Sequence, residues 1–267
     1  MKIFEIHNDE TKWITGYLFY YEHSARFYTE LPRRLDEWKV PAMFYSSVKR
    51  GEYSIGHKLS MKWVMQRIIP AERQNIASVL KENHLKEYDE YKLLRLSEGR
   101  CAQDDDYITE TGVEMLPEEI LLRLSKKIKD VIPLSRYRAL IFFCDGKARN
   151  TDLKALVADD RLFAAVMSDE KLFMRIKLSP GGNGLEWDAD RIIPAEQLYN
   201  SGTETALGYD DILNFVNLRL LDTSQLSRRL DVSRQYINQL VDKDKLTPVS
   251  ILTNTQLFSS ADIERGL

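Results

Sequence analysis

The spacing of apolar residues near the C-terminus constrains the fold more than any other feature of this 267-residue sequence. On both sides of Asp231, apolar residues fall at helical offsets: Leu226, Leu230, Val232, Ile237 and Leu240. Such offsets let two short helices bury one shared face across a tight turn, and the small Ser227 falls where they would cross. Hydroxyl groups precede both runs, so Thr223 and Ser233 are expected to cap the two helices.

The residues beyond Lys245 predict a hairpin and a closing helix. Apolar positions at 246–251, and then at 257 and 258, indicate two short strands around the polar tip 253–255. Residues 259–262 have the capping-box pattern that opens a short helix. The predicted order from Thr223 onward is therefore helix, turn, helix, hairpin and helix.

This order of elements resembles the DNA-binding domains of the MerR-type and excisionase families. Two stretches carry the resemblance: Ser233-Arg234-Gln235 and Leu257-Phe258-Ser259-Ser260-Ala261-Asp262-Ile263. The resemblance implies a winged helix-turn-helix, a module that places one helix in the DNA major groove. The chain departs from the families at Asp231, where glycine is usual. Aspartate tolerates a left-handed backbone better than most residues but less well than glycine.

If the resemblance holds, the second helix supplies the DNA contacts. Arginine can make a paired contact with guanine and glutamine with adenine, whereas a serine at a helix N-terminus suits phosphate. Helix geometry selects four residues on the face opposite Ile237: Ser233, Arg234, Gln235 and Gln239. Four cations are expected to clamp the DNA backbone: Arg228, Arg229, Lys243 and Lys245. Tyr236 could pack on a sugar or close the core.

The charge of this segment argues against strong DNA binding by a single copy. Residues 222–267 contain six basic and six acidic side chains, so the segment is neutral. Phosphate neutralisation supplies almost all non-specific affinity for DNA, so we expect a homodimer that doubles the contacts to double-stranded DNA. The alternative is a protein-interaction adaptor, for instance an antitoxin-like regulatory partner without direct DNA binding.

The composition is that of an ordinary globular protein, with 43% hydrophobic and 30% charged residues. A net charge of -3 indicates no bulk affinity for polyanions. The N-terminus lacks the apolar core of a signal peptide, and no apolar run is long enough to cross a membrane. Cys101 and Cys144 belong to no metal-binding spacing. These features predict a cytoplasmic protein with reduced thiols and no membrane partner.

An internal repeat lies upstream of the predicted helix pair. Trp63 precedes Arg-Ile-Ile-Pro-Ala-Glu at 67–72, and Trp187 precedes the same six residues at 191–196, with identical spacing. A strand-like segment of similar character precedes each copy. The repeat predicts two divergent copies of one small α+β unit, in which the tryptophans occupy core positions rather than stack on a ligand.

The second copy has a more specific pattern. It combines a hairpin turn at Asp145-Gly146, a helix start at Asp152-Leu153 and a glycine-rich hairpin turn at 180–184, and it closes on residues 193–199. From about Tyr137 to Gly202 it resembles the bacterial domain-of-unknown-function family 2442. The resemblance implies a fold but no mechanism, because the family has no established activity.

The sequence offers only weak candidates for an enzyme. Asp104-Asp105-Asp106 could hold a divalent metal, but three successive residues cannot all face one ion on a regular element. Cys101 would need a histidine partner that spacing does not identify. A polar loop or a helix start is the favoured interpretation of the aspartates. The sequence therefore predicts no catalytic residue, no cofactor and no metal.

Together these patterns predict an α+β fold in four parts. The predicted parts are a divergent first unit at 1–72, a mainly helical connector at 73–135, the second unit at 136–206, and a docking helix with the winged helix-turn-helix at 207–267. Within the connector, residues 72–85 and 118–132 are expected to form amphipathic helices. The predicted function is transcriptional regulation through DNA binding by the last part.

Overall fold

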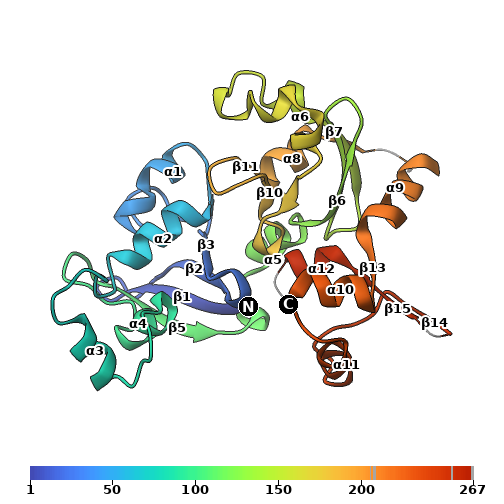
Figure 1. The fold of residues 1–267 in the computed structure, drawn as a ribbon. Helices are drawn as coiled ribbons and strands as arrows, with labels where there is room; N and C mark the ends of the chain where they lie inside the picture. Colours follow the sequence, from blue (N-terminus) through green and yellow to red (C-terminus); the bar gives the residue numbers. More distant parts are fainter. Residues whose placement is uncertain (205, 207–208, 254, 266–267) are drawn as a thin grey trace. The chain divides into compact units, whose positions relative to one another are not determined.

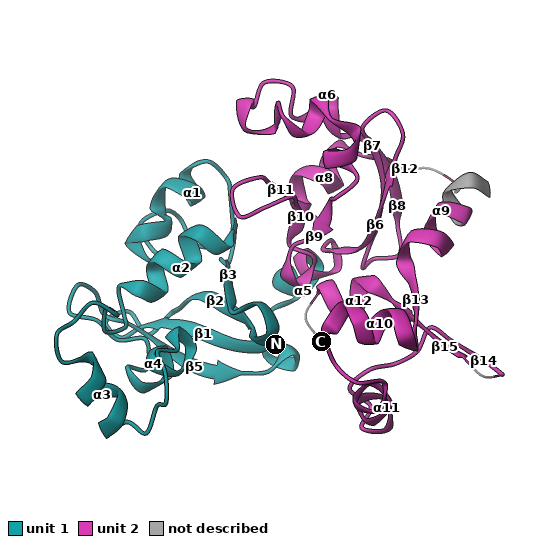
Figure 2. Ribbon diagram, in the orientation of Figure 1, with its two compact units in different colours: residues 1–122 teal, residues 123–267 magenta. Residues whose placement is uncertain are grey.

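The computed structural model describes residues 1–204, 206, 209–253 and 255–265. Its architecture is mixed α+β with several small sheets (Figure 1), which confirms the α+β class but not the finer predicted architecture. The chain divides into two compact units, Met1–Leu122 and Arg123–Leu267 (Figure 2), here called the N-terminal and the C-terminal unit. Within the described residues, no helix is both long enough and apolar enough to cross a bilayer.

The N-terminal unit is built on an antiparallel sheet with the strand order β4-β3-β2-β1-β5. Its strands are β1 (Lys2–Asn8), β2 (Ile14–Tyr21), β3 (Arg26–Glu30), β4 (Ser54–Ile55) and β5 (Asp106–Thr111). Its helices are α1 (Tyr45–Lys49), α2 (His57–Met65), α3 (Ile76–Glu82) and α4 (Glu90–Leu96). Aromatic residues of the central strands and of α2 fill the core, where Phe27 and Trp63 are almost completely buried.

The C-terminal unit begins with two sheets that share a core. The first has the order β12-β8-β7-β6 and the second the order β11-β10-β9. Their strands are β6 (Ile128–Leu134), β7 (Arg138–Phe143), β8 (Ala148–Asp152), β9 (Lys177–Leu178), β10 (Gly184–Glu186), β11 (Ile192–Pro194) and β12 (Thr203–Glu204). The accompanying helices are α6 (Leu153–Leu156), α7 (Glu170–Phe173) and α8 (Ala195–Ser201).

The glycine-rich turn connects β9 to β10, as the sequence predicts. Gly182 lies there with a φ of +69°, and a Cβ at this position would stand 2.0 Å from the Ile128 carbonyl oxygen. Only glycine fits both the left-handed backbone and this close approach. The turn is therefore a structural hairpin that lets β6 pass close by.

The last part of the C-terminal unit has the predicted order of elements (Figure 1). It contains α9 (Tyr209–Arg219), β13 (Leu220–Asp222), α10 (Thr223–Leu230), α11 (Arg234–Asp242), β14 (Ser250–Leu252), β15 (Thr255–Ser259) and α12 (Ser260–Glu264). The strands form a small antiparallel sheet, β13-β15-β14, of which β13 was not predicted. The turn residue Asn254 lies outside the described residues.

The predicted docking helix packs on the first sheet of its unit. The sequence predicts this helix over residues 207–221, of which 207 and 208 lie outside the described residues. Helix α9 covers 209–219, whereas Leu220 and Leu221 begin β13, so the predicted helix is wrong at its end. Phe215 packs edge-on against Phe142 of β7 and joins a small cluster with Ile132 and Leu140. This packing places α9 against β6 and β7 rather than in a free linker.

The predicted helix over residues 118–132 is wrong in its second half. Helix α5 (Glu118–Ser125) ends early, and Ile128 begins β6, which pairs with β7. The helical spacing of Ile120, Leu124 and Ile128 arises by coincidence, because the pairing with β7 decides the conformation of the second half. The helix predicted over residues 72–85 is present in part as α3, while α4 and β5 were not predicted.

The structure does not confirm the internal repeat as a repeated fold. Trp63 lies inside helix α2, whereas Trp187 follows strand β10. Residues 192–194 form strand β11, while the matching residues 68–70 have no regular structure. Both tryptophans do pack in hydrophobic cores, as expected.

Candidate nucleic-acid interface

Helices α10 and α11 are held together by a separate small core. Four fully buried side chains form it: Leu226, Ile237, Leu246 and Phe258. They come from α10, from α11, from the segment after α11 and from β15. One core thus fixes both helices and the hairpin relative to each other. Leu230, Val232 and Leu240 pack around it, so the apolar spacing in the sequence predicted this core correctly.

The turn between the helices has the geometry expected of a glycine position. Asp231 caps α10 with φ 55° and ψ 45°, in the left-handed region. Behind it, the Ser227 hydroxyl donates a hydrogen bond to the Val232 carbonyl oxygen. The predicted left-handed backbone at Asp231 is confirmed. The hydrogen bond from Ser227 of α10 stabilises the turn.

The second helix has the predicted cap and the first does not. The Ser233 hydroxyl accepts a hydrogen bond from the Tyr236 backbone N–H at 3.1 Å. Helix α10 is capped by Asp222 instead of Thr223, and Gln225 completes a reciprocal capping box with Asp222. An acidic residue followed three residues later by glutamine is a cap signal that the sequence already contained.

The residues expected to contact DNA lie on the open face of α11. Exposed side chains on this face or at its N-cap include all four predicted contacts: Ser233, Arg234, Gln235 and Gln239. Tyr236 is 48% exposed, so it does not close the core. Asn238 is also exposed, one helical turn after Arg234, and was missed although its spacing and amide chemistry match the other four.

The cations predicted to contact the DNA backbone differ in whether they already form an ion pair within the protein. All of Arg228, Arg229, Lys243 and Lys245 are exposed, as is Arg234. The guanidinium of Arg229 forms an ion pair with Glu264 at 2.7 Å, so part of its charge is already neutralised. The other cations have no ion-pair partner within the described residues. The cations without such a partner therefore lie at the end of α10 and at the two ends of α11.

A buried ion network anchors these elements to the rest of the C-terminal unit. Arg219, at the end of α9, lies 2.7 Å from Asp130 of β6 and 3.1 Å from Glu264 of α12. Glu264 also forms an ion pair with Arg229 of α10. Burial raises the pKa of Asp130 although Arg219 opposes this rise. The network thus links four elements, and it was not predicted from the sequence.

The aspartate cluster in the N-terminal unit neutralises a buried arginine. Arg67 has a fully buried side chain that forms ion pairs with Asp104 and Asp106, and its guanidinium stacks 3.7 Å from the Trp63 ring. Cys101 donates to Asp104 rather than to a histidine. In the described part of the chain, no three His, Cys, Asp or Glu side chains are grouped so as to hold a metal ion. Asp106 begins β5, so the predicted loop or helix start is wrong at this residue.

The buried Asp106 carboxyl should make stability depend on pH. Burial raises its pKa to about 6, and the neighbouring Asp104 adds to the rise. An unfolded aspartate titrates at about 3.9, so between these values only the folded protein holds the proton. The free energy of unfolding should then increase as the pH falls from about 6 to about 4, by roughly 2–3 kcal/mol at most.

Asp106→Asn removes the titrating group and keeps its size. Thermal unfolding of this variant should lack the increase, so the wild type should lose stability relative to the variant as the pH rises through about 6. Identical pH profiles for the two proteins would contradict the raised pKa of Asp106 in the folded protein.

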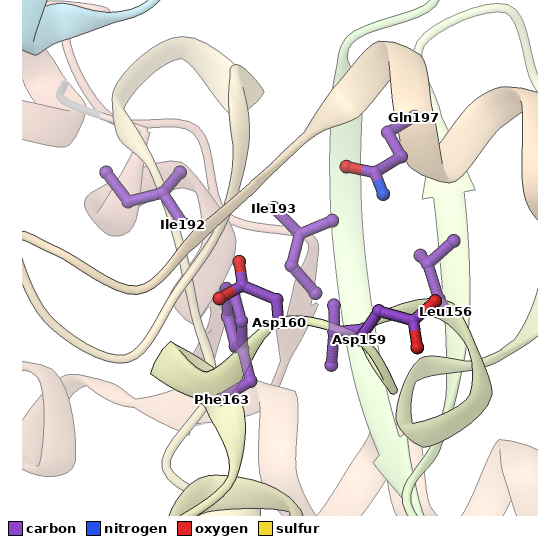
Figure 3. Close-up of a pocket in the computed structure, with 8 residues that line it drawn as sticks. Leu156, Asp159, Asp160, Phe163, Ile192, Ile193 and Gln197 are labelled. Atoms are coloured by element: carbon purple, nitrogen blue, oxygen red, sulfur yellow. The ribbon is translucent and has the colours of Figure 1, made fainter.

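A pocket of about 350 Å³ lies between α6, β11 and α8 of the C-terminal unit (Figure 3). Its lining is mixed, with apolar side chains such as Phe163 and Ile193 beside the polar groups of Asp159, Asp160 and Gln197. The carboxylates of Asp159 and Asp160 point away from each other, and the Gln197 amide lies above them in this view (Figure 3). The Asp160 carboxylate accepts the Leu162 backbone N–H. This pocket could admit a small molecule with apolar and hydrogen-bonding groups, and no sequence motif predicted it.

The comparisons with known proteins bear on one segment of the chain. No curated protein and no solved structure matches the chain. Residues 128–204 match the family model described as "Protein of unknown function (DUF2442)". The matched segment runs from β6 to β12. It includes β6, which the resemblance expected from about Tyr137 onward left out. The match supports the family resemblance for residues 128–204.

Proposed function

We propose that the protein binds double-stranded DNA through α11 and acts as a transcriptional regulator, with residues 220–265 serving as a winged helix-turn-helix. The single observation that carries this proposal is the face of α11. It presents arginine, glutamine and asparagine side chains to solvent on a helix fixed by its own small core. These are the side chains that pair with guanine and adenine edges in the major groove.

The charges support a division of roles on this face. Arg228 and Arg234 lie on either side of the turn, and the capped N-terminus of α11 offers backbone N–H groups suited to phosphate. Lys243 and Lys245 follow the other end of the helix. The neutral balance of the segment means that each copy binds weakly, and we propose that the protein acts as a homodimer.

Arg234→Ala and Gln235→Ala test the proposed base contacts. Each variant should bind a selected duplex about 1–3 kcal/mol more weakly, and should lose preference at one base pair, because a paired contact to a base edge is removed. Fluorescence anisotropy with the selected duplex and with single-base variants of it measures both effects. Both residues are exposed, so folding should be unchanged.

Arg161→Ala is the matched control. It removes an exposed arginine of the same unit that lies outside residues 220–265, and it should leave both affinity and preference unchanged. Equal losses in the control and in Arg234→Ala would mean that general charge, and not base recognition, explains the binding.

One observation favours the alternative of a protein-interaction adaptor. The hairpin of β14 and β15 exposes aliphatic side chains and has no charged residue to meet phosphate, unlike a wing that contacts DNA. An adaptor would bind a protein through this hairpin whether or not α11 is intact. Retention of a protein partner by the Arg234→Ala variant, together with no duplex binding by the wild type, would favour this alternative.

A further inference from the structure

The hairpin of β14 and β15 carries three exposed aliphatic side chains within a short stretch. Val249, Ile251 and Leu252 have exposed fractions of 56%, 71% and 53%. Single exposed apolar residues are common on protein surfaces, but three within four consecutive positions of one strand segment expose apolar area on both of its faces. The hairpin is therefore a candidate contact surface.

These side chains flank an open strand edge. In the sheet β13-β15-β14, β14 is the outer strand, and no strand of the described residues lies on its other side. Ile251 pairs with Gln256 and Leu252 with Thr255, so the two aliphatic side chains point to opposite faces of the hairpin. A strand added beside β14 would cover side chains on both faces, whereas a partner lying on one face would leave the other exposed.

The hairpin lacks the features that usually prevent edge pairing. Residues 247–258 include no Lys, Arg, Asp or Glu, and Pro248 precedes β14 instead of interrupting it. Lysine or proline within an edge strand commonly blocks pairing with another chain. An uncharged strand can also pair with its own copy without placing like charges opposite each other.

We infer that β14 pairs antiparallel with β14 of a second copy of this chain. A two-fold axis at Ile251 places that residue opposite its own copy and Ser250 opposite Leu252, so the two small sheets become one continuous sheet. This inference deepens the proposed function and rests on it for its consequence, which is that two α11 helices are presented to one duplex. Pairs of three-residue strands bury far less than the roughly 1,200–2,000 Å² of a stable interface, so the free dimer is weak and DNA that holds both copies strengthens it.

Disulfide trapping tests a weak interface of this kind directly. In a background with Cys101→Ser and Cys144→Ser, Ile251→Cys places two thiols opposite each other, at a separation that a disulfide can bridge. Asp242→Cys, at an exposed position on α11, is the control. Mild oxidation without DNA should give a covalent homodimer at least about fivefold faster from Ile251→Cys than from the control, because only paired thiols sit within bonding distance. Equal rates would overturn the inference.

A second variant separates this interface from DNA binding. Ile251→Lys combined with Leu252→Lys should still bind a single half-site like the wild type, but should lose the extra affinity for two half-sites. Leu162→Lys, at an exposed leucine elsewhere in the unit, should keep both the affinity for one half-site and the extra affinity for two. Trapping at position 251 in a protein that binds no duplex would refute the proposed function and leave the interface intact. Duplex binding without trapping would overturn the interface alone.

Discussion

Arg219→Met is expected to lower the free energy of unfolding of the C-terminal unit by about 3–5 kcal/mol, because it leaves a buried carboxylate without its ion-pair partner. Asp130 is 5% exposed, and Arg219 is the cation that it contacts. Glu264 keeps Arg229, so the loss falls mainly on Asp130. Chemical denaturation of the whole chain, followed by tryptophan fluorescence and circular dichroism, measures the change.

The double variant Arg219→Met with Asp130→Leu is the matched control. Replacing both partners of a buried pair with apolar residues is often close to neutral, so the double variant should recover most of the lost stability. If the single and double variants are equally unstable, the loss comes from packing around Arg219 rather than from the unpaired charge.

Phe258→Ala is expected to destabilise the α10 and α11 pair by about 3–5 kcal/mol, because it leaves a cavity in a core of only four fully buried side chains. Phe258 is completely buried and comes from β15, so it joins the hairpin to both helices. Hydrogen exchange of the backbone amides in α10 and α11 should speed up, while exchange in β7 should change much less.

Two further variants delimit this prediction. Phe258→Leu keeps most of the side-chain volume, so its loss of stability should be less than about half that of Phe258→Ala. Leu162→Ala, at an exposed position, should change stability by less than about 0.5 kcal/mol. Uniformly faster exchange throughout the C-terminal unit after Phe258→Ala would show that α10 and α11 have no core of their own.

Local signals near the C-terminus predicted the structure well. The apolar offsets around Ile237, the cap at Ser233 and the left-handed backbone at Asp231 are all present. Each of these depends on residues a few positions apart, which a single sequence displays directly. The cap at Asp222 was equally visible, and it was missed because a hydroxyl residue followed it.

Contacts between distant parts of the sequence could not be predicted in this way. Arg219 meets Asp130, and Arg67 meets Asp104, across long stretches of chain. Strand β6 shows the same limit, since its pairing with β7 overrides a helical pattern at Ile128. The hexapeptides at 67–72 and 191–196 are identical, yet only the second contains a strand, β11. Their different surroundings decide this difference.

Selection of duplexes from a random pool by the wild-type protein at low salt tests the central claim most directly. We predict enrichment of a pattern whose half-sites are related by a two-fold axis, with guanine or adenine at positions whose preference disappears in Arg234→Ala and Gln235→Ala. Retention of no duplex at low salt, or enrichment that the two variants leave unchanged, would contradict DNA recognition by α11.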